Sequence, residues 1–423
     1  MIEIKKWCVG MCLMAPAMML AMDADVPTFV GWRGLHRDGV YAETGLLKQW
    51  PADGLRELWA VTNIGSGYSS PVVAGDRLYV TGADPAEKQE VFSAYTLDGT
   101  RIYSVPYGTT WKGSYPPVRS TPTFYQGSAY TVSGSGEVVC IDCTTGKIRW
   151  KVDGQAQFDR VNGRWGACES PLVFDDKVIY TPCGKNAYMV ALSVADGKVL
   201  WQVPPIEKED GGYISPIMIA YKGRRQIIQQ TSQSLVGVDP DTGVLAWRFI
   251  DWPAHTNFVA RIVCNTPVYR DGKIFVSNGY NQGAFQVQLA DDLRSVKLIW
   301  RNEDLDTHIG GFVLVKDTLY GSSWISNSKG NWVAVDWETG KTLFDTAWPG
   351  HSKGCIIQAG EQLICYEESR GNIGLIQPSR EKFDVVSTFR FRYGAGPHWA
   401  HPVVHAGVLY VRRGSALVAY ALN

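Results

Sequence analysis

Residues 140–150 read CIDCTTGKIRW, and variants of this motif recur along the chain. In the clearest copies a small residue ends an apolar run, an aspartate caps the turn, and a glycine takes a backbone conformation with positive φ. An aromatic residue closes the motif, and we expect it to pack on the neighbouring repeat. The further copies are Ala191–Trp201, Gly237–Trp247, Ala334–Phe344, the stretched Gln288–Trp300 and the shortened Ala94–Tyr103.

A second motif, a polar residue followed by proline, opens each repeat and leads into alternating apolar residues and a tight turn. Proline has no N–H for a strand ladder and is tolerated at the first position of a strand. Degenerate copies near Phe312 and Ile356 fill the one long gap in the spacing and bring the total to eight. The clear copies are Ser70-Pro71, Thr121-Pro122, Ser170-Pro171, Ser215-Pro216, Thr266-Pro267 and His401-Pro402.

These repeats predict an all-β protein, an eight-bladed β-propeller of four-stranded antiparallel blades. The turn pairs Gly75-Asp76, Asp175-Asp176 and Asp271-Gly272 predict β-hairpins. The last segment, Ala406–Leu422, supplies only part of a blade, whereas Leu58–Asn63 is a lone strand. We therefore expect the N-terminal strand to close the ring by pairing with the C-terminal blade, which removes two free sheet edges.

The N-terminus has the pattern of a Sec-type signal peptide. Lys5 and Lys6 precede an uncharged run, Trp7–Met22, that is short for a membrane span. A lipoprotein signal is the rival reading, but large residues precede Cys8 and Cys12 where a small one is wanted. We predict a signal peptide over residues 1–22, a single propeller domain over residues 23–423, and a periplasmic or secreted bacterial protein without a transmembrane span.

The charge balance argues against nucleic acid as a partner. Lys plus Arg and Asp plus Glu number 41 each, so no net field attracts a polyanion. We expect a monomer.

Seven cysteines remain after the signal segment, an odd number. Cys168 and Cys183 flank the hairpin predicted over Pro171–Thr181, and its two-residue turn would place them opposite each other. This placement is compatible with a cross-strand disulfide between them or with a pair of buried thiols.

The closing motifs resemble the tryptophan-docking repeats of the PQQ-type (quinoprotein) propeller superfamily, over nearly all of the mature chain. The segment from Trp32-Arg33-Gly34 through Asp38-Gly39 to Tyr68-Ser69-Ser70-Pro71 is similar to the opening of bacterial PQQ-like repeat proteins. The resemblance implies one of two kinds of protein. One is the quinone-dependent alcohol and sugar dehydrogenases, and the other is the cofactor-free scaffolds similar to BamB.

A dehydrogenase of this superfamily would hold PQQ with calcium over the ring centre. Many alcohol-oxidising members also use a disulfide between adjacent cysteines, and this chain has no Cys-Cys pair. Glu169 and Asn265, beside the proline motif, are the best candidate oxygen ligands, although such residues more often satisfy hydrogen bonds at a channel mouth. The sequence therefore favours no cofactor, with PQQ and calcium as the alternative.

The residues just before the proline motifs should ring one mouth of the channel, where loops from every blade converge. The set mixes cations, one acid and aromatics, which suits a small polar or anionic ligand, a glycan or a peptide segment; a solvated funnel of paired charges is the alternative. The predicted ligand-binding residues are Tyr68, Arg119, Glu169, Tyr213, Asn265, His308, Lys353, Trp399 and His401.

Three C-terminal histidines do not predict a metal site. On a regular strand His398 and His401 point to opposite faces, while His401 and His405 lie roughly 13 Å apart at about 3.3 Å per residue. No metal is expected from this cluster.

The leading functional hypothesis is an exported, cofactor-free propeller that binds a partner or ligand in the cell envelope, in a BamB-like role. The alternative is a PQQ-dependent oxidoreductase of the alcohol or polyvinyl-alcohol dehydrogenase type. A carbohydrate-binding role is a third reading.

Overall fold

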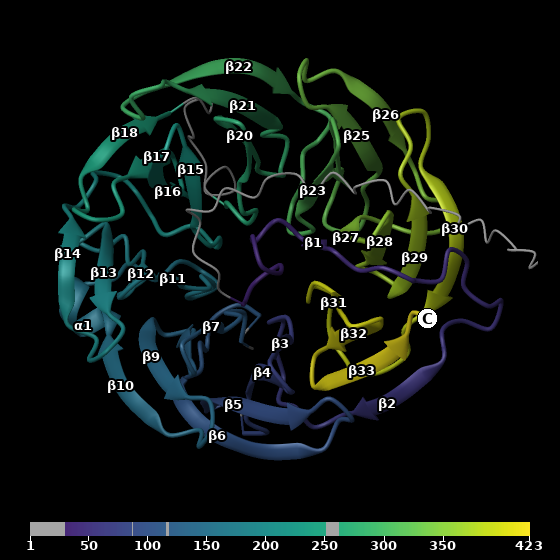
Figure 1. Cartoon of the computed structure of the whole chain (residues 1–423), viewed down its shortest axis with the longest axis horizontal. Coiled ribbons are helices and arrows are strands. Elements are labelled where there is room, and N and C mark those ends of the chain that lie inside the picture. Colours follow the sequence, from purple (N-terminus) through teal and green to yellow (C-terminus); the bar gives the residue numbers. More distant parts are fainter. Residues whose placement is uncertain (1–29, 87, 116–117, 251–261) are drawn as a thin grey trace, which may run out of the picture.

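A computed structural model describes residues 30–86, 88–115, 118–250 and 262–423. The described residues form eight sheets arranged as a closed ring (Figure 1). The expectation of an eight-bladed all-β propeller is confirmed. The predicted signal peptide, with Cys8 and Cys12, lies outside the described residues.

The first four blades each contain four antiparallel strands in chain order from the channel outward. Blade 1 holds β3 (Val72–Ala74), β4 (Arg77–Ala83), β5 (Gln89–Thr96) and β6 (Arg101–Thr109). Blade 2 holds β7 (Thr123–Tyr125), β8 (Ser128–Val132), β9 (Glu137–Asp142) and β10 (Ile148–Asp153). Blade 3 holds β11 (Leu172–Phe174), β12 (Lys177–Tyr180), β13 (Met189–Ser193) and β14 (Val199–Val203). Blade 4 holds β15 (Ile217–Tyr221), β16 (Arg224–Gln230), β17 (Leu235–Val238) and β18 (Leu245–Phe249).

Blades 5 to 7 continue the pattern. Blade 5 holds β19 (Val268–Arg270), β20 (Lys273–Ser277), β21 (Ala284–Leu289) and β22 (Val296–Asn302). Blade 6 holds β23 (Phe312–Val315), β24 (Thr318–Ser322), β25 (Trp332–Asp336) and β26 (Thr342–Thr346). Blade 7 holds β27 (Gly354–Ala359), β28 (Gln362–Glu367), β29 (Asn372–Gln377) and β30 (Asp384–Arg390).

The eighth blade joins the two ends of the chain. It consists of β31 (Val403–His405), β32 (Val408–Arg413), β33 (Ala416–Ala421) and, outermost, β2 (Glu57–Val61). β2 runs antiparallel to β33, with Trp59 opposite Ala419. The N-terminal strand therefore closes the ring as expected, beginning and ending one or two residues earlier than Leu58–Asn63.

Each clear proline motif places its strand as predicted. The innermost strands begin at the residue directly after the proline in all six clear copies, and β23 and β27 coincide with the degenerate copies. One feature was not predicted. β1 (Val40–Tyr41) pairs in parallel with the channel edge of β27, which gives blade 7 five strands. The innermost strand of a blade has a free ladder edge, and residues 40–41 use it.

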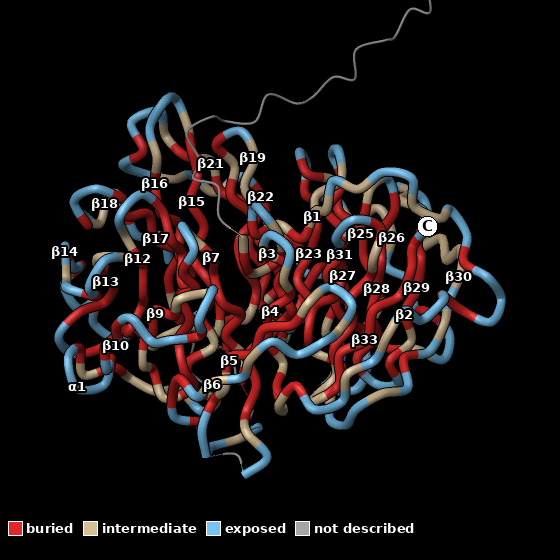
Figure 2. Tube along the Cα trace, turned by 60° about the horizontal axis from the view of Figure 1, so that its bottom comes forward, coloured by how far each residue is buried: buried red, intermediate tan, exposed pale blue. Residues whose placement is uncertain are grey.

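The core lies between blades rather than within one centre. Each pair of neighbouring blades shares its own apolar cluster, such as Val132, Cys140 and Trp150 of blade 2 with Val178 and Leu192 of blade 3. Figure 2 shows the consequence, with buried strands throughout the ring and exposed turns on both faces.

The closing aromatic residues join successive blades. Trp150 donates its indole N–H to the Val194 carbonyl at 2.9 Å, and a Cβ added to Gly197 would lie 2.8 Å from its ring. Trp201 donates in the same way to the Pro240 carbonyl at 3.1 Å. The turn glycine is required both for its positive φ, 74° at Gly197, and for the space that the ring of the preceding blade occupies.

Little of the described chain is helical. α1 (Gly154–Phe158) is a single turn capped by Asp153, which accepts from the Gln155 and Ala156 amides. Within the described ranges, the structure contains no helix whose length and apolar character suit a membrane crossing.

Candidate functional site

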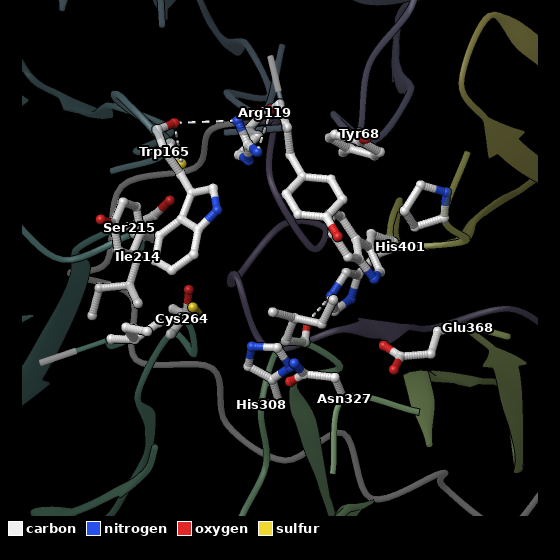
Figure 3. A pocket seen from close by; sticks show the side chains of 18 of the residues that line it. Tyr68, Arg119, Trp165, Ile214, Ser215, Cys264, His308, Asn327, Glu368 and His401 are labelled. Carbon is white, nitrogen blue, oxygen red and sulfur yellow. Dashed lines mark hydrogen bonds between the residues drawn. The ribbon is translucent and has the colours of Figure 1, made fainter. Parts of the chain in front are cut away.

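One face of the ring contains a cavity of about 470 Å³ at the mouth of the channel, and we call it the mouth cavity. Its walls come from loops that precede innermost strands and from the β20–β21, β24–β25 and β28–β29 loops, which meet near the ring axis. Figure 3 shows Trp165 and Cys264 on one side of the cavity and Tyr68 and Glu368 on the other. Its lining includes Trp32, Tyr68, Tyr115, Arg119, Trp165, Cys168, Ser170, Tyr213, Ile214, Ser215, Ile262, Cys264, Thr266, Tyr280, His308, Ile309, Asn327, Ser328, Glu368, Ser369, Trp399 and His401.

The mouth cavity contains six of the nine predicted ligand-binding residues. They are Tyr68, Arg119, Tyr213, His308, Trp399 and His401. The other three, Glu169, Asn265 and Lys353, are almost fully buried behind the wall and do not line it. Whether any of the nine contacts a ligand stays a prediction.

The position of a residue relative to the proline of its repeat accounts for many of the lining residues, although Ile214, second from Pro216, lines the cavity as well. Counting back from the proline of each clear repeat, the third residue lines the cavity in every case. Glu169 and Asn265 are second from their prolines, and in an extended segment successive side chains point to opposite sides. The residues at the third position are Tyr68, Arg119, Cys168, Tyr213, Cys264 and Trp399.

This third position could have identified Cys168 and Cys264, which the sequence analysis did not place in the mouth. Burial raises the pKa of Cys168 to about 11 and raises that of Cys264 further, so both are neutral thiols and form apolar wall. Tyr115, Trp165 and Tyr280 were also missed, because they project from longer loops that carry no repeat signal.

Aromatic rings line opposite sides of the cavity. Trp399 lies between Tyr68 and Tyr115, with ring centroids 4.9 and 5.0 Å apart. Across the cavity Trp165 meets Tyr213 edge-on at 5.2 Å. These contacts hold each ring at a defined angle, so the walls are rigid apolar surfaces with polar edges.

Arg119 supplies positive charge to the wall. Its guanidinium donates to the carbonyls of Trp165 at 3.2 Å and Tyr115 at 2.5 Å, and lies 5.4 Å from the ring centroid of Tyr68. The side chain thereby links the two aromatic walls.

A buried ion pair forms another part of the rim. The Lys353 ammonium donates to the Glu368 carboxylate and, at 2.8 Å, to the Asn327 carbonyl. Burial raises the pKa of Glu368 and Lys353 opposes that rise. The pair thus brings no net negative charge to the cavity.

Both histidines of the mouth are neutral. Burial, with Lys353 nearby, lowers the pKa of His308 to about 3, and its Nε2 lies 2.8 Å from the Tyr280 hydroxyl. Burial and Arg33 lower the pKa of His401 to about 3. Arg33 donates to His401 Nδ1 at 2.9 Å, which assigns the neutral tautomer whose Nε2–H donates to the Ile309 carbonyl at 3.2 Å.

Residues 30–41, which we call the plug, lie in the channel and contribute Trp32 to the lining of the cavity. In Figure 1 this purple trace reaches the centre of the ring. Trp32 lines the cavity, donates to the Thr266 hydroxyl at 3.1 Å and meets His401 edge-on. In the sequence, part of this segment is marked only by its resemblance to the opening of PQQ-like repeat proteins, and no signal places it in the channel.

Two buried arginines hold the plug. Arg37 donates to the Ser170 and Pro216 carbonyls at 2.8 and 3.0 Å, to the Thr123 hydroxyl at 3.1 Å and to the Pro171 carbonyl. Burial lowers its pKa to about 9. Arg33 donates to the Phe312 carbonyl at 2.5 Å and to His401. Blades 2, 3, 4, 6 and 8 are therefore tied to one segment on the ring axis.

The proposed oxygen ligands for calcium are engaged elsewhere. The Glu169 carboxylate accepts the amide and hydroxyl of Thr181 at 3.0 and 3.1 Å. Asn265 donates to the Thr307 and His308 carbonyls and accepts the Gly311 amide at 3.1 Å, which ties blade 5 to blade 6. Among the described residues there is no cluster of three His, Cys, Asp or Glu side chains suited to a metal ion. These residues do not fit a calcium-bound quinone.

The possible cysteine pair and the three C-terminal histidines lie in different environments. Cys168, which is half-buried, and Cys183, which is buried, are unbonded thiols in this structure, and their pairing stays a prediction. The β11–β12 ladder ends at Leu172–Ile179, and Cys183 has φ 44°, so the regular pairing that would bring the two cysteines together stops before them. His398 is buried against Tyr366, His401 contacts Arg33, and His405 is exposed.

Comparison with known proteins shows family and fold. A family model described as outer membrane protein assembly factor BamB matches residues 87–346. Quinohemoprotein alcohol dehydrogenase ADH IIB of Pseudomonas putida is 28% identical over 172 residues, 37% of this chain and 24% of that protein. The match thus spans about a quarter of that relative's length.

Solved structures share the architecture at low identity. BamB from Moraxella catarrhalis superposes with a TM-score of 0.61 at 14% identity, over 87% of this chain and 99% of that one. A quinohemoprotein alcohol dehydrogenase from Comamonas testosteroni gives 0.61 at 14% identity, over 88% and 77%. At such identity the likeness concerns the fold alone.

Proposed function

This chain belongs to the family of the outer membrane protein assembly factor BamB, and from that premise we propose that it is an exported, cofactor-free binding protein of the cell envelope. The mouth cavity is its binding site. The observation that carries the proposal is the aromatic-walled mouth cavity, next to which hydrogen bonds of Trp32 and Arg37 hold the plug in the channel.

The chemistry of the wall supports binding rather than turnover. The two mouth thiols are neutral, both mouth histidines have pKa values of about 3, and Glu368 is paired with Lys353. None of these groups is poised as a base or nucleophile near neutral pH. A cavity of this size with a few polar groups among aromatic side chains suits recognition.

The test is retention of envelope components by the purified full-length protein. We expect an envelope partner to be recovered by the wild type and lost with Trp165→Ala, which removes one aromatic wall. Arg101→Gln, an exposed residue on the outermost strand β6, should retain it. Equal recovery by wild type and Trp165→Ala would show that the mouth is not the binding site.

The second candidate is a PQQ-dependent alcohol dehydrogenase, which the partial match to quinohemoprotein alcohol dehydrogenase ADH IIB favours. Titration of the protein with PQQ and calcium, followed by absorbance and by alcohol-dependent dye reduction, separates the two candidates. We expect no saturable uptake and no dye reduction. Calcium-dependent uptake with alcohol oxidation would replace the proposal by this one.

A further inference from the structure

Part of the lining of the mouth cavity is apolar and favours an apolar group. Ile214, Ile262 and Ile309 line it together with the neutral thiols of Cys168 and Cys264. A hydroxyl or amide of a ligand placed among these side chains would lose its hydrogen bonds to water without replacement, which costs about 1–3 kcal/mol for each group.

Three hydroxyl side chains that also line the cavity accept hydrogen bonds from within the protein. The Ser170 hydroxyl accepts the Thr121 amide at 3.0 Å, and the Ser215 hydroxyl accepts the Ser170 amide at 2.9 Å. Thr266 accepts the indole N–H of Trp32. Each of these hydroxyls still has an O–H of its own to donate, so the apolar preference of the cavity rests on the isoleucines, the thiols and the aromatic rings.

The rim of the mouth cavity is polar. Asn327, Ser328 and Ser369 are exposed there and offer amide and hydroxyl groups at the edge of the pit. Such groups can pair with the N–H and C=O of a peptide backbone. An apolar pit beneath a polar rim is the usual form of a pocket that anchors one large side chain of a bound chain.

The described residues bring a positive charge to the rim. Arg119 contributes one positive charge, Lys353 and Glu368 together contribute none when both are ionised, and the two histidines are neutral. Arg164 adds a further guanidinium 5.6 Å from the ring centroid of Trp165. Acidic residues beside the anchor would complement this field.

We propose that the mouth cavity is an anchor pocket for one large apolar side chain, flanked by acidic residues, of an extended peptide segment from a partner protein. The inference rests on the proposed function, since it names what that same site binds. The anchor lies between the aromatic walls and reaches the isoleucines, while its acidic neighbours face Arg119.

Three blocked tripeptides test the proposal by calorimetry on the full-length protein. The probes are acetyl-Glu-Phe-Glu-amide, acetyl-Glu-Ala-Glu-amide and acetyl-Lys-Phe-Lys-amide. We expect the first to bind, the second to bind about tenfold more weakly because the apolar anchor is missing, and the third about threefold more weakly because its charges oppose the rim.

Two variants assign the contacts. Arg119→Gln should weaken acetyl-Glu-Phe-Glu-amide about threefold and leave acetyl-Lys-Phe-Lys-amide unchanged or improved. Trp165→Ala should weaken both phenylalanine probes. Arg101→Gln is the matched arginine control and should change neither, because it lies on the outer strand.

Several outcomes would overturn the inference. They are equal binding of the phenylalanine and alanine probes, tighter binding of the lysine probe, and binding of glucuronate oligomers in preference to any peptide. If no tripeptide binds but Trp165→Ala still abolishes recovery of an envelope partner, the anchor chemistry is wrong and the proposed function stands. If Trp165→Ala leaves that recovery intact, the proposed function fails as well.

Discussion

The guanidinium of Arg33 donates to Nδ1 of His401 across 2.9 Å, although 368 positions of sequence separate them. Arg33 belongs to the plug, and His401 opens blade 8 and lines the mouth cavity. The contact joins two residues near opposite ends of the described chain. One belongs to the plug and the other lines the candidate site.

Arg37→Ala should destabilise the protein by about 3–5 kcal/mol, because the Ser170, Pro171 and Pro216 carbonyls would be left buried without this donor. Urea unfolding followed by tryptophan fluorescence measures the effect. Arg101→Ala, at an exposed position, should cost less than about 0.5 kcal/mol. Similar losses in the two variants would mean that the plug contributes no particular stability.

Replacing a turn glycine by alanine should reduce stability by an amount that depends on what lies next to the added Cβ. Gly127 and Gly197 both have φ 74°, but an added Cβ at Gly127 meets nothing within 4 Å, whereas at Gly197 it lies 2.8 Å from Trp150. We expect Gly127→Ala to cost about 1–2 kcal/mol for the left-handed conformation alone. Gly197→Ala should cost about 1–3 kcal/mol more through overpacking. Equal unfolding midpoints would contradict the packing of Trp150 on this turn.

The Lys353–Glu368 pair should show strong coupling. Lys353→Met alone leaves the buried carboxylate without its ammonium and should cost about 3–5 kcal/mol. Adding Glu368→Leu removes the uncompensated charge and should recover most of that loss. A double-mutant cycle of thermal or urea unfolding gives the coupling, and additive losses would show that the two charges do not stabilise each other.

Glu169 should make stability depend on pH. Burial raises its pKa from 4.5 to about 7, so the folded protein holds a proton there that the unfolded chain has released. Its contribution is present below pH 4.5 and is lost as pH rises to 7. Relative to Glu169→Gln, the wild type should lose about 1.4 kcal/mol per pH unit over that window.

The matched control is Glu361→Gln, whose carboxylate is 89% exposed. Its difference from the wild type measures the effect of removing an exposed carboxylate at each pH. A Glu169→Gln difference with the same pH dependence would mean that Glu169 ionises normally in the folded protein.

The ring itself was predictable because its signals are local. Proline, the turn pairs and the closing aromatic each act within a few residues, and their spacing fixed the blade count and the position of β2. The mouth was predictable to within one position. Glu169 and Asn265 were misplaced because the pleat alternates at every residue, so a shift by one moves a side chain from the cavity to the wall.

The plug was not predictable in the same way. Arg33 and Arg37 donate mainly to backbone carbonyls, which every sequence supplies, so nothing at Ser170 or Phe312 identifies them as partners. Tyr115 and Trp165 reach the cavity from irregular loops, where neither helical nor strand periodicity applies.

The plug also constrains the order in which the chain can fold. The acceptors of Arg33 and Arg37 belong to blades 2, 3, 4, 6 and 8, so no local fragment of the chain presents them together. Residues 30–41 are synthesised early. Arg33 and Arg37 are therefore solvated by water until the blades that carry their acceptors have folded. Such long sequence separations slow folding, so the arginine contacts of residues 30–41 can be complete only when those blades are in place.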